Sequence, residues 1–158
     1  SIGRWINKMD TTYDSERDTL EHQQKVRALM GRIESAIGAR LSEHDASKLL
    51  PPEKEMYDIW RPVLDSLPID SPSYNDALVG MGDALKHHYA ANRHHPEHFE
   101  NGINDMTLID IIEMVCDWSA ASKRKDPNGR VNMLWARDRF GIEPQLAHII
   151  ENTLGILE

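Results

Sequence analysis

Two adjacent residues, His44 and Asp45, carry side chains that suit a divalent metal ion. The histidine offers an imidazole nitrogen and the aspartate a carboxylate oxygen, and hard or borderline divalent metals bind both donors. Two ligands do not complete a metal site. Three other places in the chain could supply the remaining ligands: His22, the histidine-rich segment 87–98, and Asp117.

The segment 87–98 holds five of the eight histidines in the chain. Helical spacing predicts that His88 points towards the interior and that His87 faces solvent. Beyond the helix, a loop restrained by proline carries three more histidines: His94, His95 and His98. Their nitrogens could converge on one cavity, and which of them bind metal stays open. The alternative is a surface cluster that binds nickel or zinc adventitiously.

His22 and Asp117 both lie in helical segments with apolar neighbours. His22 falls on the same helical stripe as Val26 and Leu29, which predicts an inward orientation. Asp117 lies in a helix that is apolar nearly all round, where a buried carboxylate is costly unless a cation or hydrogen bonds offset it. Glu113, four residues earlier, shares its face. The alternative for His22 is a core histidine that is hydrogen-bonded to the backbone. The alternative for Asp117 is a salt bridge or helix cap satisfied by a neighbouring arginine.

The elements that must position these residues are all helical, because the chain shows no convincing strand period, internal repeat or low-complexity tract. We expect an all-α fold with helices over about 16–37, 40–50, 52–67, 73–94, 105–123, 131–140 and 144–154. The short helix 40–50 would carry His44 and Asp45, and the prolines at 51 and 52 would end it.

Length and composition limit the classes of protein. A chain of 158 residues predicts one domain. A net charge of −8 and a pI near 5.4 give no basic surface for duplex nucleic acid. A bound metal reverses the local sign, so a small phosphorylated substrate remains compatible with this charge.

Cys116 is the only cysteine, which rules out an internal disulfide and disfavours a thiolate zinc site. We therefore expect a reducing, cytoplasmic location. We expect no membrane anchor, because no apolar run approaches the roughly 20 residues of a spanning helix and the first residues lack a signal peptide's apolar core.

Taken in order, the histidine, the His-Asp pair, the histidine-rich segment and the final aspartate resemble the HD superfamily. These all-α proteins bind divalent metal through the pattern H…HD…D, and extra histidines resemble those of dinuclear branches in which the HD aspartate bridges two metals. The match to this pattern implies four ligands: His22, His44, Asp45 and Asp117. The resemblance to HD-fold proteins with six ligands implies two more, His88 and His95. His94 and His98 are further candidates.

The stretches 44–49, 92–99 and 110–118 resemble more closely a small HD-like family of unknown function found in bacteria and phages. This closer resemblance spans about residues 15–125. It implies a single HD-like domain over 1–158, with an N-terminal extension at 1–14 and C-terminal helices at 126–158, in a bacterial cell or a phage-infected host.

The HD resemblance implies a metal-dependent phosphohydrolase that acts on a small nucleotide or phosphoester. One or two divalent ions, chosen among manganese, magnesium, cobalt, nickel, zinc and iron, would activate a water and polarise the phosphate. Lys48 stands where HD branches with an HDxGK motif have lysine, and would neutralise the phosphate. The glutamate of HDxxE nucleotidases is missing there, so Glu113 becomes the candidate for acid-base work or for orienting a ligand histidine. Further candidate phosphate contacts are Arg93, Lys123 and Arg124.

Two other functions use the same ligands. Some HD-fold proteins with six ligands hold a di-iron centre and oxygenate small polyols or phosphonates, and a non-catalytic module would keep the metal as a structural pin while it binds a nucleotide or a protein. Metal identity and turnover separate the three hypotheses. The apolar final helix could pack on the body or across a homodimer.

Overall fold

In a computed structural model of the chain, residues 13–68, 71–124 and 126–157 are described. These residues form helices, turns and loops without any strand, so the predicted all-α class is confirmed. The chain divides into two compact units, Ser1–Gly38 and Ala39–Glu158, and each is described by itself. The prediction of a single domain stays a prediction.

The first unit contains most of helix α2, which runs from Ser15 to Glu43 and ends within the second unit. Asp14 precedes the helix, and its Oδ1 accepts the backbone N–H groups of two first-turn residues at 3.1 Å. The predicted end at residue 37 is wrong, because Gly38 stays helical. A single glycine inside a helix costs only about 1 kcal/mol, which neighbouring turns can offset.

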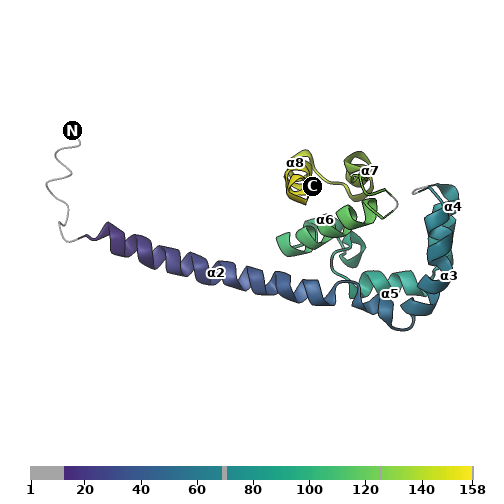
Figure 1. Cartoon of the computed structure of the whole chain (residues 1–158), viewed down its shortest axis with the longest axis horizontal. Coiled ribbons are helices and arrows are strands. Elements are labelled where there is room, and N and C mark those ends of the chain that lie inside the picture. The colour runs from purple at the N-terminus through teal and green to yellow at the C-terminus, as the bar shows by residue number, and fades with distance from the viewer. Residues whose placement is uncertain (1–12, 69–70, 125, 158) are drawn as a thin grey trace. The chain divides into compact units, whose positions relative to one another are not determined.

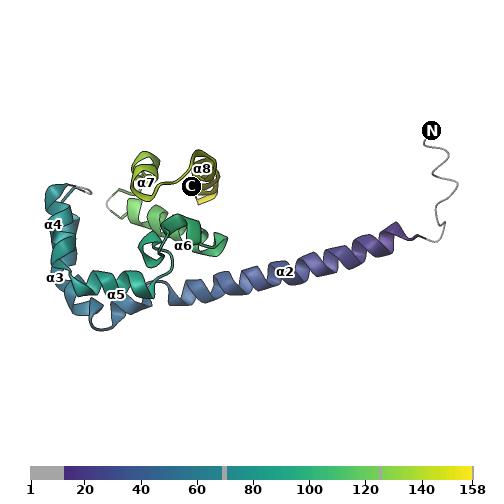
Figure 2. The same ribbon diagram turned by 180° about the vertical axis from the view of Figure 1, so that it is seen from behind.

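The second unit is an assembly of short helices, drawn in Figures 1 and 2. Its α-helices are α3 (Glu53–Ser66), α4 (Pro72–Gly80), α5 (Asp83–Ala91), α6 (Leu108–Ser122), α7 (Met133–Phe140) and α8 (Pro144–Leu157). Its 3₁₀ helices are η1 (Ala46–Leu49), η2 (Pro96–His98) and η3 (Gly102–Asp105). The helices predicted over 52–67, 105–123, 131–140 and 144–154 are confirmed to within a few residues.

The predicted short helix over 40–50 is wrong. Helix α2 ends at Glu43, and Asp45 adopts the left-handed conformation with φ 56° before η1 begins. Aspartate tolerates this conformation better than most residues because its short side chain can bond locally. His44 and Asp45 therefore lie on a tight turn between two helices, which brings both side chains to one site.

The predicted helix over 73–94 is also wrong, because it is two helices, α4 and α5. Gly82 interrupts the helix between α4 and α5 because its φ is 54°, a conformation that glycine adopts without steric cost. Gly80 allows the Trp60 ring to approach, since a Cβ there would lie 2.5 Å from ring carbons. The apolar spacing continues through this break, so periodicity alone did not reveal it.

Two apolar clusters hold the second unit together. Figures 1 and 2 show α7 and α8 on the same side of α6, and their cluster consists of Met114, Val115, Met133, Ala136, Ile142, Ala147 and Ile150. The smaller cluster joins α3 to the segment from α4 to Met81 through Leu64, Ala77 and Met81. In the described ranges, no helix is both long enough and apolar enough to cross a membrane.

We expect Gly82→Ala to lower the free energy of unfolding by about 1–2 kcal/mol, because an L side chain is strained at this positive φ. Gly155→Ala is the matched control, since Gly155 is inside α8 with open space around it; it should be neutral or slightly stabilising. Urea unfolding of both variants measures the difference. Equal stabilities would contradict the assigned backbone conformation.

Candidate metal centre

The carboxylate of Asp45 lies at the centre of a cluster of imidazole rings. Its Oδ1 is 3.6 Å from Nε2 of His88 and 3.6 Å from Nε2 of His94, and its Oδ2 is 3.6 Å from Nε2 of His44. These separations are too long for good hydrogen bonds. They suit donor atoms around a shared ion, which lie about 3–3.5 Å apart when each bond is about 2.1 Å.

The potential ligands form two sets that share Asp45. The three-histidine subsite consists of Asp45, His88, His94 and His95, and the His44 subsite consists of His44, Asp45 and Asp117. Within each set, one donor atom per residue lies within 4.8 Å of the others. Because Asp45 belongs to both sets and has two oxygens, the arrangement can accept one ion or two ions bridged by this carboxylate.

Two buried atoms of the cluster have no hydrogen-bond partner: Oδ1 of Asp45 and Nε2 of His94. Buried polar atoms in folded proteins are almost always satisfied, so each such atom calls for an explanation. Both atoms belong to the three-histidine subsite and face each other at 3.6 Å. A cation between them would satisfy both, so the residues present fit a metal ion.

Glu113 orients two of the imidazoles. Its Oε1 accepts hydrogen bonds from Nδ1 of His44 at 2.9 Å and from Nδ1 of His94 at 3.0 Å. With the proton on Nδ1, each Nε2 keeps a lone pair that is directed at Asp45, as in the carboxylate–histidine–metal arrangement. We therefore interpret His44, His94 and Glu113 as a hydrogen-bonded group that orients the metal ligands, and not as a further metal site.

Asp110 and Arg40 extend this support to the start of helix α6. Asp110 is fully buried, and its carboxylate accepts hydrogen bonds from Nη2 of Arg40 at 2.7 Å and from Nη2 of Arg93 at 3.0 Å. Arg40 also donates a hydrogen bond to Glu113 at 3.0 Å. Asp110 closes a capping box with Thr107. Burial raises the pKa of Asp110, but the hydrogen bonds from Arg93 and Thr107 outweigh burial and lower the pKa to about 2.

The imidazoles of the three-histidine subsite are held neutral. Burial lowers the pKa of His88 and of His94, and burial together with the neighbouring His94 lowers the pKa of His95 to about 2. Burial alone would raise the pKa of Asp45, but the Lys48 ammonium, 2.6 Å from Oδ2, lowers the pKa below its ordinary value. Neutral imidazoles and an ionised carboxylate are the protonation states that bind metal.

The structure brings together five of the six predicted ligands in the second unit and adds His94 to them. His22 is exposed in the first unit, so its predicted inward orientation is wrong, and its role as a ligand stays a prediction. His98 belongs to none of the donor sets found among the described residues, and its Nδ1 is 2.9 Å from the Tyr89 carbonyl oxygen. The side chain of Asp117 is 28% exposed and so less buried than its apolar neighbours predicted.

Among the basic residues predicted to contact phosphate, Lys48 lies beside the centre, paired with Asp45. Arg93 is paired with Asp110, and Arg124 lies 3.7 Å from an oxygen of Asp65. Lys123 donates to the backbone oxygen of Leu157.

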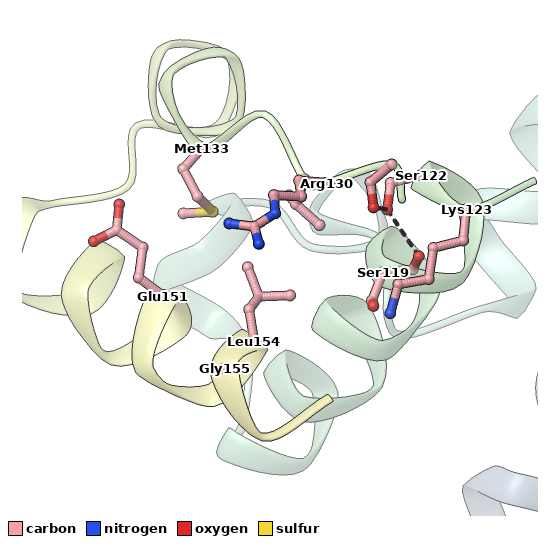
Figure 3. Close-up of a pocket in the computed structure, with 10 residues that line it drawn as sticks. Ser119, Ser122, Lys123, Arg130, Met133, Glu151, Leu154 and Gly155 are labelled. Carbon is pink, nitrogen blue, oxygen red and sulfur yellow. Dashed lines mark hydrogen bonds between the residues drawn. The ribbon is translucent and has the colours of Figure 1, made fainter. Parts of the chain in front are cut away.

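Lys123 also lines a cavity of about 250 Å³ between the ends of α6 and α8, shown in Figure 3. Ser119 and Ser122 line the same cavity. By helical spacing, Ser119 is on the opposite side of α6 from Asp117, so this cavity is separate from the metal cluster.

Sequence reasoning missed two buried acids, Glu53 and Asp110, and it missed Arg40. The exposed fraction of both acids is 0%. The pattern Thr107-x-x-Asp110 signals a capping box and could have placed Asp110 at a helix start. No local pattern signals that Glu53, at the start of α3, points into the histidine cluster.

Comparison with known families gives one match. The sequence profile of a family described as "Family of unknown function (DUF5662)" matches residues 11–156. The chain belongs to this family. No curated protein and no solved structure matches the chain. Because membership of DUF5662 assigns no activity, the function has to be argued from the geometry of the site.

We expect His44→Ala and Asp117→Ala to lower the metal content that survives gel filtration, since each removes a donor from the His44 subsite and leaves the three-histidine subsite in place. His148→Ala should retain metal as wild type does, because His148 is exposed on α8 and belongs to neither subsite. Metal content by mass spectrometry measures the difference. Equal content in the three variants would overturn the ligand assignment.

Asp110 makes a pH-dependent contribution to stability. Its pKa is lowered from 3.8 to about 2 in the folded state, so the contribution is complete above about pH 4 and is lost as the pH falls through 2. We expect the stability difference between wild type and Asp110→Asn to narrow by about 2 kcal/mol over this range. Urea unfolding from pH 5 to 2 measures it, with the exposed Asp138→Asn as control. A constant difference would contradict the assignment.

Proposed function

We propose that the protein is an HD-type metal-dependent phosphohydrolase that acts on a small nucleotide or another phosphoester. The observation that carries this proposal is the position of Asp45, whose two oxygens face separate groups of imidazole nitrogens at 3.6 Å. The order histidine, His-Asp, histidines and aspartate along the chain supports the same proposal. We also propose that the protein is cytoplasmic and that its substrate is a small phosphorylated molecule.

The His44 subsite would hold one divalent ion and the three-histidine subsite a second, with Asp45 shared between them. When bound, such ions lower the pKa of a coordinated water and polarise a phosphoryl oxygen. Four imidazoles beside two carboxylates favour manganese, iron, cobalt, nickel or zinc over magnesium, which prefers oxygen ligands.

Lys48 is the residue that would contact the phosphate. Its ammonium lies 2.6 Å from Asp45 and 5.1 Å from the centroid of the Tyr57 ring, so the positive charge is already held at the edge of the centre. An ammonium there would attract a phosphate dianion and orient it towards Asp45. The neighbouring carboxylates explain why a fixed cation is useful: without one they would repel the substrate.

Glu113 supports the proposal as an orienting residue and not as the acid-base catalyst. Its Oε1 is bonded by two imidazole nitrogens and its Oε2 by Arg40, so neither oxygen is free to exchange protons with a substrate. Of the two roles expected for Glu113, the geometry favours orientation of His44 and His94.

A second candidate is a di-iron oxygenase. The specific observation in its favour is the donor set of four imidazoles and two carboxylates, in which one carboxylate lies between the two groups. Such nitrogen-rich sets also suit iron. Oxygen uptake with a polyol or phosphonate would distinguish it from hydrolysis, and metal binding without turnover would indicate a non-catalytic module.

The decisive experiment measures metal content and the absorption spectrum of protein purified without a histidine tag or chelator, and then phosphate release from a panel of nucleotides. We expect one or two ions per chain and phosphate release that a chelator abolishes. About two irons with visible absorption and oxygen uptake would replace the proposal with the oxygenase. Absence of metal after reconstitution would overturn both enzyme proposals.

We expect Lys48→Gln to lower kcat/KM for the hydrolysed substrate roughly 10- to 100-fold, because a charge-assisted hydrogen bond contributes about 1.5–3 kcal/mol. Metal content should be unchanged, since Lys48 donates no lone pair. Lys54→Gln is the control, because Lys54 forms an exposed pair with Asp58 on α3. Equal kcat/KM for the two variants would remove Lys48 from the substrate site.

A further inference from the structure

Glu53, the first residue of helix α3, is a fully buried carboxylate that no lysine or arginine contacts among the described ion pairs. A buried carboxylate is costly unless charge or hydrogen bonds compensate it. Asp110, which is the other fully buried acid in the described ranges, is compensated by two arginines. Glu53 is instead compensated by two imidazoles and one hydroxyl, which indicates a role directed at those imidazoles.

Both oxygens of Glu53 are used. Oε2 is 2.9 Å from Nδ1 of His88 and accepts the Ser47 hydroxyl at 3.0 Å, while Oε1 is 2.6 Å from Nδ1 of His87. An ionised carboxylate accepts only, so the proton of His88 resides on Nδ1. Its Nε2 is then left with a lone pair that faces Asp45 Oδ1 at 3.6 Å and His95 Nε2 at 2.8 Å.

Asn92 fixes the direction of these hydrogen bonds. Its Nδ2 donates to Ser47 Oγ at 2.8 Å and to the backbone oxygen of His88 at 2.8 Å. Because Ser47 accepts from Asn92, its single proton is available for Glu53. The Glu53 carboxylate therefore accepts one hydrogen bond from Ser47 and one from His88. Rotation of the His88 ring would break the hydrogen bond between His88 and Glu53.

We infer that Glu53 is a positioning residue that sets the tautomer and ring orientation of His88 and thereby the metal affinity of the three-histidine subsite. Glu113 does the corresponding work for His44 and His94, so the His44 subsite depends on a different carboxylate. This inference rests on the proposed metal centre. It predicts that loss of Glu53 weakens one subsite and leaves the other able to bind.

The test compares wild type, Glu53→Gln and Glu55→Gln by titration of the metal-free full chain with Mn²⁺ and Co²⁺. Glu55 is a matched control, because it is an exposed acid in the same first turn of α3. We expect Glu53→Gln to weaken binding at the three-histidine subsite about 10- to 100-fold, in the range of other outer-shell substitutions. The His44 subsite should bind as in wild type, and Glu55→Gln should match wild type at both.

The Co²⁺ absorption spectrum separates positioning from a structural role. Glu53→Gln should lose the same absorption band of bound Co²⁺ that His88→Ala loses. Added metal should raise the thermal unfolding midpoint of Glu53→Gln less than it raises that of wild type. Ser47→Ala keeps the charge of Glu53 and removes the hydrogen bond that Ser47 donates to it, together with the one that Ser47 accepts from Asn92, so it tests the inference even if Glu53→Gln does not fold. It should show an intermediate loss of affinity at the same subsite.

The outcomes distinguish the inference from the proposal on which it rests. Failure of wild type to bind Mn²⁺ or Co²⁺ would overturn the proposed function together with this inference. Metal binding by wild type, with equal affinities and spectra in Glu53→Gln or in Ser47→Ala, would overturn the inference alone.

Discussion

The carboxylate of Asp45 is the group on which the arrangement of the candidate site depends. Its two oxygens are 3.6 Å from the Nε2 atoms of His44, His88 and His94, and its Oδ1 is buried without a hydrogen-bond partner. The left-handed backbone at Asp45 makes this possible, because it ends helix α2 and turns the chain into η1 within a few residues. A helix through this point would have sent His44 and Asp45 in different directions.

Carboxylates behind the imidazoles provide the second layer of order. Glu113 receives two imidazole nitrogens and Arg40, while Glu53 receives two imidazole nitrogens and a hydroxyl. Each therefore fixes a proton on Nδ1 and leaves Nε2 available. Burial lowers the pKa of His88 and of His94, which favours their neutral forms and acts in the same direction. The proposed metal chemistry depends on these protonation states as much as on the identity of the ligands.

Much of the fold could be predicted because its signals are local. Helices α3, α6, α7 and α8 follow from apolar spacing, proline positions and caps, and the inward orientation of His88 follows from the same spacing. The breaks at Asp45 and Gly82 were missed, because each falls within a continuous apolar pattern and depends on a backbone conformation that periodicity does not encode. Asp117 is less buried than predicted for a related reason: apolar neighbours in sequence do not guarantee that other residues cover a side chain in space.

The sequence by itself determined the helical class, the kinds of donor atom available and the His-Asp pair that brings two of them together. Only the tertiary structure decided that His94 joins His88 and His95 while His98 does not, and that Glu53 and Asp110 are buried. The physical reason is that spacing specifies which face of a helix a side chain occupies. Convergence of side chains from α3, α5, α6 and the turn at Asp45 depends instead on how those helices pack.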